Sequence, residues 1–278
     1  MSNYLITGTS KGLGLCLVKE LLKRPASSVG LIFATTRSAP TPALQKAIDE
    51  SSGRVVNIIV DPTDLESLRA ALPVVEKRLG DAGLDVLINN VGTGPFANGI
   101  KNMYASVLSG GKKKTVLTQE YTDYDHLPNR DNLADVFNVN VMSVQNVTTA
   151  FLPLLEKGER KKVVNMSTTV SSFAYQDVFV RLPAPAYKIT KAALNMLTLQ
   201  WGMEYRDKGF TIFGVSPGWC KTDMGGEGAN LEPEQGAEAA MKVIDAAGKE
   251  EVGRMVNIRL EGFEDGPGDR YQGGVVPW

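Results

Sequence analysis

Two residues with proton-transfer chemistry stand four positions apart in the second half of the chain. They are Tyr187 and Lys191, and Pro185 just before them is a favoured residue in the first turn of a helix. Residues four apart on a helix lie one turn apart on the same face. A free phenol has a pKa of about 10, and a neighbouring ammonium lowers it by favouring the phenolate. Such a pair can donate a proton to a carbonyl oxygen, although the same spacing also occurs on ordinary surface helices.

A glycine-rich stretch near the start of the chain has the composition of a phosphate-binding turn. Residues 7–14 read Thr-Gly-Thr-Ser-Lys-Gly-Leu-Gly, between an apolar run at 4–6 that is typical of a strand and apolar residues at helical spacing over 15–22. Glycine lets a ligand approach the backbone, and a helix N-terminus offers unpaired N–H groups to a phosphate. The stretch therefore predicts the first turn of a dinucleotide-binding βαβ unit.

The elements that position these residues alternate in type along the chain. Strand-like runs at 29–37, 55–60, 84–90, 163–166, 210–215 and 254–258 alternate with helical patterns at 43–48, 67–79, 133–155, 187–205 and 233–247. Such alternation indicates a parallel sheet that is covered on both faces. Within the helical pattern at 67–79, Pro73 predicts a kink or a boundary. We predict an α/β fold with a Rossmann-type doubly wound sheet of about seven strands, in the order 3-2-1-4-5-6-7, within a single domain over residues 1–278.

Two segments interrupt this alternation. Residues 93–132 show no clean period, and a connection of this length is either functional or mobile, so we treat it as an irregular insertion. The segment 222–232 is rich in glycine and is interpreted as a substrate lid. His126, the only histidine, lies in the insertion among scattered aspartates. One histidine is too few for a typical metal site, so we expect no metal.

The composition restricts the class of protein. The 278 residues are 43% hydrophobic and 22% charged with a formal net charge of −1, which does not suggest a nucleic-acid or membrane-surface partner. Cys16 and Cys220 are the only cysteines and imply no disulfide framework. We find no room for a signal peptide and no apolar run long enough to cross a bilayer. We therefore expect a cytoplasmic protein that binds neither nucleic acid nor membrane.

The charges around the expected ribose site predict NADP(H) as the cofactor. NAD-binding proteins of this fold carry an acid about 20 residues beyond the glycine turn. Residues 35–38 are Thr-Thr-Arg-Ser with no acid, and Lys11 lies inside the turn. Two cations, Lys11 and Arg37, favour a 2′-phosphate, because arginine pairs with phosphate through a planar fork. The alternative is that both side chains simply point to solvent.

Five motifs in order make the chain resemble the short-chain dehydrogenase/reductase family from end to end. Besides the glycine turn and the Tyr187–Lys191 pair, they are Asn-Asn-Val-Gly at 89–92, Asn140 within Phe-Asn-Val-Asn-Val, and Ser-Pro-Gly-Trp-Cys-Lys-Thr-Asp-Met at 216–224. The last motif and the Val-Pro-Trp at 276–278 look most like sniffer-type carbonyl reductases, and the Tyr187 region is also similar to fungal norsolorinic acid ketoreductases. The resemblance implies NADPH-dependent reduction of a ketone or aldehyde to an alcohol, with secondary metabolism as one setting.

The resemblance also implies a role for each matched residue. Tyr187 would donate the proton, and Lys191 would lower its pKa and hold the nicotinamide ribose. Asn140 would position a water that relays protons to Lys191, or else act as a helix-packing amide. Asn89 and Asp61 would line the adenine side, although Asp61 before a proline could equally be a turn residue. The other cofactor-binding residues would be Gly8, Ser10, Lys11, Gly12, Leu13, Gly14, Arg37, Val91, Gly92, Pro217, Gly218, Cys220 and Thr222.

The catalytic serine of the family has no direct counterpart here. Residues 166–172 read Met-Ser-Thr-Thr-Val-Ser-Ser, and direct alignment places Thr168 at the usual position. A threonine hydroxyl can make the same hydrogen bond, though its branched carbon restricts the rotamer. Ser171 is the alternative, because the segment from there to Tyr187 is longer than usual in the family. At most one of the two hydroxyls is expected to contact the substrate.

Other functions and the assembly state stay open. A redox sensor could bind NADP(H) through the same fold without reducing a substrate, and a non-reductive enzyme could also be built on it. The intact Tyr187–Lys191 pair and Asn140 favour a reductase of a small-molecule carbonyl substrate. The family often dimerises through the helices that begin near Leu133 and Tyr187, so we expect a homo-oligomer, either a dimer or a tetramer.

Overall fold

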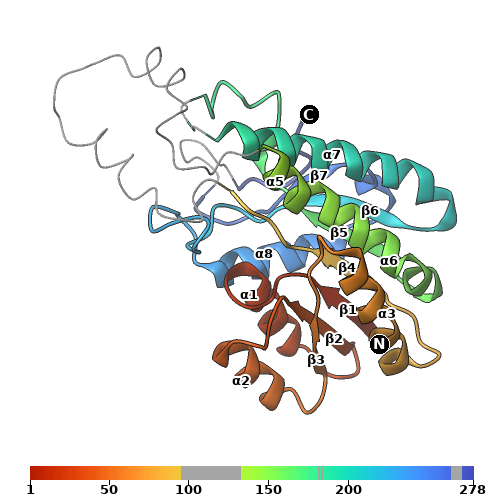
Figure 1. Cartoon of the computed structure of the whole chain (residues 1–278). Coiled ribbons are helices and arrows are strands. Elements are labelled where there is room, and N and C mark those ends of the chain that lie inside the picture. The colour runs from red at the N-terminus through yellow and green to blue at the C-terminus, as the bar shows by residue number, and fades with distance from the viewer. Residues whose placement is uncertain (95–132, 181, 183, 264–270) are drawn as a thin grey trace.

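The computed structural model describes residues 1–94, 133–180, 182, 184–263 and 271–278 (Figure 1). The predicted insertion at 93–132 therefore lies outside the described residues except for its first two positions, and His126 lies outside them as well. Within the described part of the chain, no helix is both long and apolar enough to span a lipid bilayer.

Seven parallel strands form one sheet in the order β3-β2-β1-β4-β5-β6-β7, which confirms the predicted topology (Figure 1). The strands are β1 (Ser2–Ile6), β2 (Val29–Thr36), β3 (Val55–Ile59), β4 (Val86–Asn89), β5 (Lys162–Met166), β6 (Thr211–Ser216) and β7 (Met255–Asn257). The strand order reverses around β1, which pairs with β2 on one edge and with β4 on the other. In doubly wound sheets a ligand crevice forms at this reversal, beyond the carboxyl ends of the strands.

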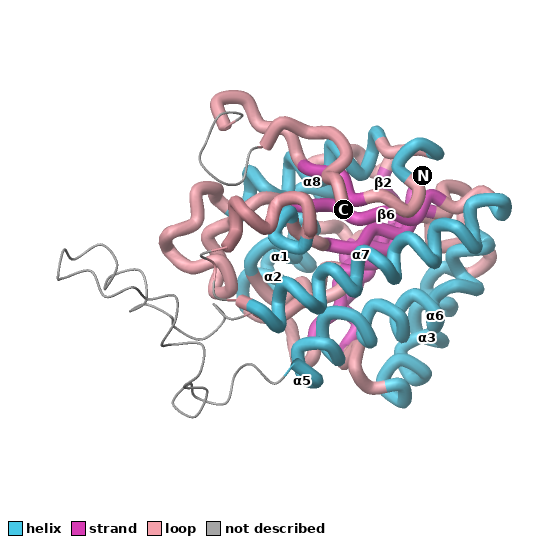
Figure 2. Tube along the Cα trace, turned by 90° about the horizontal axis from the view of Figure 1, so that it is seen from above, coloured by secondary structure: helices cyan, strands magenta, loops and turns pink. Residues whose placement is uncertain are grey.

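Helices cover both faces of the sheet (Figure 2). One face carries α1 (Gly12–Leu22), α2 (Pro42–Glu50) and α8 (Pro233–Ala246), and the other carries α3 (Leu65–Leu79), α6 (Ser143–Lys157) and α7 (Pro185–Tyr205). Alternation along each strand separates two apolar cores: in β1, Tyr4 and Ile6 pack on the α1 and α8 side, whereas Leu5 packs on the α3 and α6 side. The carboxyl ends of the strands are thereby left free for ligand-binding loops.

Two helical predictions need correction. The pattern over 133–155 forms α5 (Leu133–Phe137), then a π turn (Asn138–Met142), and only then α6. Hydrophobic spacing does not detect one extra residue in a turn, and such π bulges occur frequently at functional sites. The helix α3 also continues through Pro73, where a kink or boundary was expected. Burial of Leu68, Val75 and other apolar residues of α3 outweighs the hydrogen bond that proline removes.

The segment 222–232 is the inner part of a loop whose ends are joined. Cys220 bridges to Leu231, and the main-chain N–H groups of Lys221 and Leu231 donate to Leu231 and Trp219 across the neck of the loop. Inside the loop, the indole N–H of Trp219 donates to the carbonyl oxygen of Gly225 at 2.8 Å. The predicted lid is therefore a closed loop attached between β6 and α8.

Candidate active site

The glycine turn between β1 and α1 has the shape of a phosphate cradle. Gly8 and Gly12 have φ values of +71° and +57°, a region that favours glycine. At Gly14, an added Cβ would lie 2.2 Å from the carbonyl oxygen of Gly8, so only glycine fits there. No side chain caps the N-terminus of α1 at Lys11, which leaves the N–H groups of its first turn for a ligand. The residues present therefore fit the pyrophosphate of a dinucleotide.

Asn90 joins this turn to the loop that follows β4. Its Nδ2 donates to the carbonyl oxygens of Thr7 at 2.9 Å and Gly8 at 3.2 Å. In return, the hydroxyl of Thr7 accepts from the backbone N–H groups of Asn90 at 2.9 Å and Val91 at 3.1 Å. Asn90 was absent from the predicted site, although its place in the Asn-Asn-Val-Gly motif was a signal that could have identified it.

The side chain of Asn89 points away from this turn. It is buried on the face of the sheet that α6 and α7 cover, where its Nδ2 donates to Thr148 Oγ1 at 3.1 Å and to Asn165 Oδ1 at 2.9 Å. Asn165 in turn donates to Thr198 Oγ1 on α7 at 2.8 Å. A contact between Asn89 and the adenine would therefore be left to its main chain, which narrows the predicted role.

The helix α7 carries Tyr187 and Lys191 on one face, as the spacing predicts. The ammonium of Lys191 lies 6.0 Å from the centroid of the Tyr187 ring and donates to the carbonyl oxygen of Met166, at the end of β5, at 2.7 Å. Lys191 is 4% exposed. This burial lowers the pKa of Lys191 to about 8, because the charged form is desolvated. The lysine is still predominantly cationic at neutral pH.

Asn140 ties the loop after β4 to α7. From the π turn, its Oδ1 accepts from the N–H of Thr93 at 2.8 Å, and its Nδ2 donates to the carbonyl oxygen of Thr93 at 2.9 Å and to Thr190 Oγ1 at 3.0 Å. A Cβ added to Gly92 would lie 3.4 Å from both Asn140 Oδ1 and Lys191 Nζ. Both N–H groups of the amide are thus used, which leaves only a lone pair of Oδ1 for a relayed water.

The two candidate hydroxyls after β5 are in different situations. Ser171 is buried, donates to the carbonyl oxygen of Thr168 at 2.6 Å and accepts from Asn195 Nδ2 at 2.8 Å. The hydroxyl of Thr168 is half-buried and accepts from the N–H of Val170 at 3.3 Å. Among the described residues, the hydroxyl proton of Thr168 has no acceptor. Thr168 is therefore the hydroxyl that remains available to a substrate.

Three charged residues lie near the expected ribose site, and each has a different set of partners. Lys11 forms an ion pair with Asp223 of the lid, with 72% and 66% of the two side chains exposed. Arg37 is exposed at the end of β2 and makes no ion pair within the described part of the chain. Asp61 accepts from the hydroxyl and N–H of Thr63, and these hydrogen bonds lower its pKa, with Arg37 adding to the effect. Asp61 thus caps its own turn and remains an ionised carboxylate near Arg37.

The lid contacts both halves of the site. The methyl carbon of Thr222 lies 3.2 Å from the position of a Cβ at Gly12. A Cβ at Gly94 would lie 3.1 Å from the ring of Tyr187 and 3.7 Å from the side chain of Met224. The segment 222–232 therefore lies against the glycine turn at Gly12, and its Met224 and the ring of Tyr187 both lie close to Gly94. The predicted positions at the carboxyl edge of the sheet are 8–14 in the turn, 91–92 after β4, and 217, 218, 220 and 222 after β6.

The two cysteines are buried structural residues. Cys16 on α1 and Cys220 beside the lid are each 7% exposed, and burial is the first cause that raises the pKa of each thiol to about 12. A thiol with so high a pKa is a poor nucleophile at neutral pH. Any contact of Cys220 with a cofactor would therefore be one of shape or main chain, not of thiolate chemistry.

Comparison with known proteins agrees with this geometry. The family model described as short chain dehydrogenase matches residues 2–232. Short-chain dehydrogenase/reductase tropE of Talaromyces stipitatus is 28% identical, covering 94% of this chain and 91% of the relative. The NADPH-bound carbonyl reductase from chicken fatty liver superposes with a TM-score of 0.76 at 27% identity, covering 100% of this chain and 99% of that chain. The carbonyl reductase Sniffer of D. melanogaster does so with a TM-score of 0.75 at 25% identity, over 100% of both chains.

The match to the family model runs from β1 to the end of the lid and includes the glycine turn, Asn140, Tyr187 and Lys191. The two solved carbonyl reductases extend the likeness over the whole length of the chain. The chain therefore belongs to the short-chain dehydrogenase/reductase family of oxidoreductases.

Proposed function

We propose that the protein is an NADPH-dependent carbonyl reductase that converts a ketone or aldehyde to an alcohol. The observation that carries the proposal is the pairing of Tyr187 and Lys191 on one face of α7, with 6.0 Å between the ammonium and the ring centroid and with Gly94 close to both the Tyr187 ring and Met224. The nicotinamide cofactor would supply the hydride when bound. The protein supplies position and the proton.

The proton chemistry belongs to four side chains. Tyr187 donates its phenolic proton to the carbonyl oxygen, and the cationic form of Lys191 favours the resulting phenolate. Thr168 orients the same carbonyl oxygen, because its hydroxyl proton has no acceptor among the described residues. Asn140 forms hydrogen bonds with Thr93 and so supports the loop after β4. Its Oδ1 keeps one lone pair for a water that would relay a proton to Lys191.

The choice of NADP(H) rests on charge. Residues 35–38 contain no acid that would bind the ribose hydroxyls of NAD, and Arg37 carries no competing ion pair within the described residues. Lys11 is the second cation. On cofactor binding, the 2′-phosphate would replace the carboxylate of Asp223 as the partner of the Lys11 ammonium. The NADPH described for the chicken enzyme supports the same assignment.

We also propose a cytoplasmic homo-oligomer that acts on a small molecule, with secondary metabolism as one setting. The support for the assembly is an exposed apolar row on α7. Ile189, Met196 and Met203 recur every seven residues and are 50%, 56% and 57% exposed. Residues at this spacing lie near one helix face, and a second copy of the chain could cover them.

The test is the Tyr187→Phe variant, compared with wild type in a screen of NADPH consumption over aromatic ketones, quinones and aldehydes. We expect NADPH binding to persist and turnover to be lost, because phenylalanine keeps the ring and removes the proton. Tyr175→Phe, the same change at a tyrosine 38% exposed, is the matched control. Retained turnover in Tyr187→Phe would refute the proton-donor role. A wild type that binds NADPH and reduces none of these carbonyls would favour the sensor instead.

A further inference from the structure

The face of α7 that carries the reactive pair continues beyond it. Asn195 follows Tyr187 and Lys191 at the same four-residue spacing, so the three side chains lie along one row of the helix. Lys191 reaches the last residue of β5, and Asn195 reaches the loop just after it. This row therefore sets the position of α7 along β5 through polar contacts.

Asn195 binds both flanks of Thr168. Its Oδ1 accepts from the hydroxyl of Ser167, one residue before Thr168, at 2.6 Å. Its Nδ2 donates to the hydroxyl of Ser171, three residues after Thr168, at 2.8 Å. All three side chains of this polar clasp are buried, with exposed fractions of 3% for Asn195, 5% for Ser167 and 3% for Ser171. Buried hydrogen bonds of this kind are costly to break, because the partner is left unpaired.

Ser171 transmits this clasp to Thr168. Its hydroxyl donates to the carbonyl oxygen of Thr168 at 2.6 Å and closes the short turn Thr169–Ser171. The side chain of a threonine has few allowed rotamers, and these depend on the backbone angles. Fixing the main chain of Thr168 thus fixes the direction of its hydroxyl more tightly than it would for a serine.

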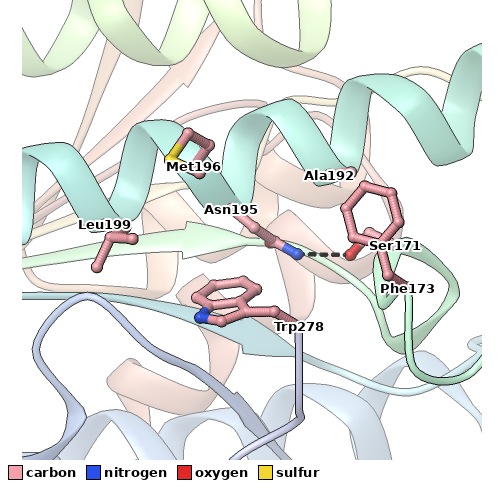
Figure 3. Close-up of a pocket in the computed structure, with 7 residues that line it drawn as sticks. All are labelled: Ser171, Phe173, Ala192, Asn195, Met196, Leu199 and Trp278. Carbon is pink, nitrogen blue, oxygen red and sulfur yellow. Dashed lines mark hydrogen bonds between the residues drawn. The ribbon is translucent and has the colours of Figure 1, made fainter.

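One side of this loop borders a cavity. A cavity of about 160 Å³ lies against the clasp, and Figure 3 shows Asn195 reaching from α7 to Ser171 beside Trp278. The walls of the cavity are Ser171, Phe173, Ala192, Asn195, Met196, Leu199 and Trp278. In the single chain, Phe173 at the edge of the cavity is 76% exposed. The clasp borders this cavity, while the far end of the loop is held separately: the hydroxyl of Ser172 donates to the carbonyl oxygen of Pro277 at 2.5 Å, and Gln176 Nε2 donates to that of Val170 at 2.9 Å.

We propose that Asn195 and Ser171 are a pair of positioning residues that aim the Thr168 hydroxyl at the carbonyl oxygen protonated by Tyr187. The pair acts through Thr168, on the substrate and not on the cofactor. This inference rests on the proposed reductase function. It assigns Ser171, the alternative to Thr168 in the sequence, a supporting role at the same site.

The test is a double-mutant cycle with Ser171→Ala, Thr168→Ala and the double variant, using NADPH and 4-nitrobenzaldehyde as the probe. If Ser171 acts through Thr168, Ser171→Ala lowers kcat by roughly tenfold, since a small misplacement of an orienting group can cost up to about 100-fold. The same change adds nothing in the Thr168→Ala background. The Kd for NADPH stays within about twofold throughout, because the glycine turn is untouched.

Three further variants separate positioning from stability. Ser51→Ala is the matched control, since Ser51 is a buried serine that donates to the carbonyl three residues earlier at 2.6 Å, far from the site. Asn195→Asp keeps the acceptor for Ser167 and removes the donor to Ser171, so it should reproduce the loss of kcat. Ser171→Thr, which retains the hydroxyl, should restore most of it.

The outcomes distinguish this inference from the proposed function. An equal fall in kcat from Ser171→Ala in both backgrounds, or a parallel fall in Tm and NADPH affinity, would reduce Ser171 to a structural residue and overturn the inference alone. An active Thr168→Ala beside an inactive Ser171→Ala would make Ser171 itself the substrate contact. A wild type without turnover of this aldehyde or of any carbonyl in the wider screen would remove the proposed function and the inference together.

Discussion

The two ends of the site are held in place by different means. The glycine turn is constrained by main-chain sterics: a Cβ at Gly14 would meet the carbonyl oxygen of Gly8 at 2.2 Å, and Asn90 Nδ2 donates to the carbonyl oxygens of Thr7 and Gly8. The loop after β5 is constrained by buried side chains, Asn195 and Ser171, next to a cavity of about 160 Å³. The cofactor end thus tolerates almost no change, whereas the substrate end can be altered by exchanging single side chains.

We expect the largest effect from Gly14→Ala, which tests the steric constraint at the cofactor end. The added carbon would lie 2.6 Å from Asn90 Nδ2 as well as 2.2 Å from the Gly8 oxygen, so the turn must shift. We expect a loss of stability of about 1–3 kcal/mol, as for other overpacked sites, and NADPH binding too weak to measure by fluorescence titration. Gly248→Ala is the control, since nothing lies within 4 Å of its Cβ position. Unchanged NADPH binding in Gly14→Ala would show that sterics do not govern the turn.

We expect a smaller effect from Arg37→Asp, which tests the role of charge at the cofactor end. It replaces a cation that has no ion pair among the described residues by the acid that NAD-binding proteins carry after the second strand. We expect the ratio of kcat/KM for NADPH to that for NADH to fall by about 10- to 100-fold, because a charge-assisted contact with the 2′-phosphate is lost. Arg69→Asp, on the surface of α3, is the control. An unchanged ratio would count against NADP(H) as the preferred cofactor.

The burial of Lys191 beside Met166 predicts a further effect, on stability. Burial lowers the pKa of Lys191 from 10.5 to about 8, and it lowers the pKa of Lys162 to about 8 as well. At pH values between about 8 and 10.5, these lysines hold a proton in the unfolded chain but have largely released it in the folded chain. The free energy of unfolding of the cofactor-free protein therefore rises with pH, by at most about 1.4 kcal/mol per pH unit for each lysine.

Urea denaturation at pH 8 and pH 10 measures this rise in wild type and in Lys191→Met. The variant removes one of the two buried ammonium groups, so its free energy of unfolding should increase less over the same interval. Lys208→Met, at an exposed lysine, is the control. An equal increase in wild type and Lys191→Met would mean that Lys191 is not the group that titrates.

Local patterns accounted for most of the fold. The positions of the strands, the glycine turn and the shared face of Tyr187 and Lys191 all depend on spacing within short segments, and spacing is visible in a sequence. The π turn at Asn140 was not predicted, because one inserted residue leaves the hydrophobic period almost unchanged. The continuation of α3 through Pro73 was missed for a related reason, since its cause is burial against distant strands and helices.

The amino-acid sequence by itself determined the fold, the family and the residues able to move a proton, because each follows from residue type at fixed local spacing. Only the tertiary structure decided that Ser171 donates to the carbonyl oxygen of Thr168, whereas the Thr168 hydroxyl has no acceptor among the described residues, and that the Asn89 side chain points into the interior. It also placed Asn195 against both flanks of Thr168. These outcomes depend on hydrogen bonds between segments far apart in the chain, and such partners exist only after the sheet has brought the segments together.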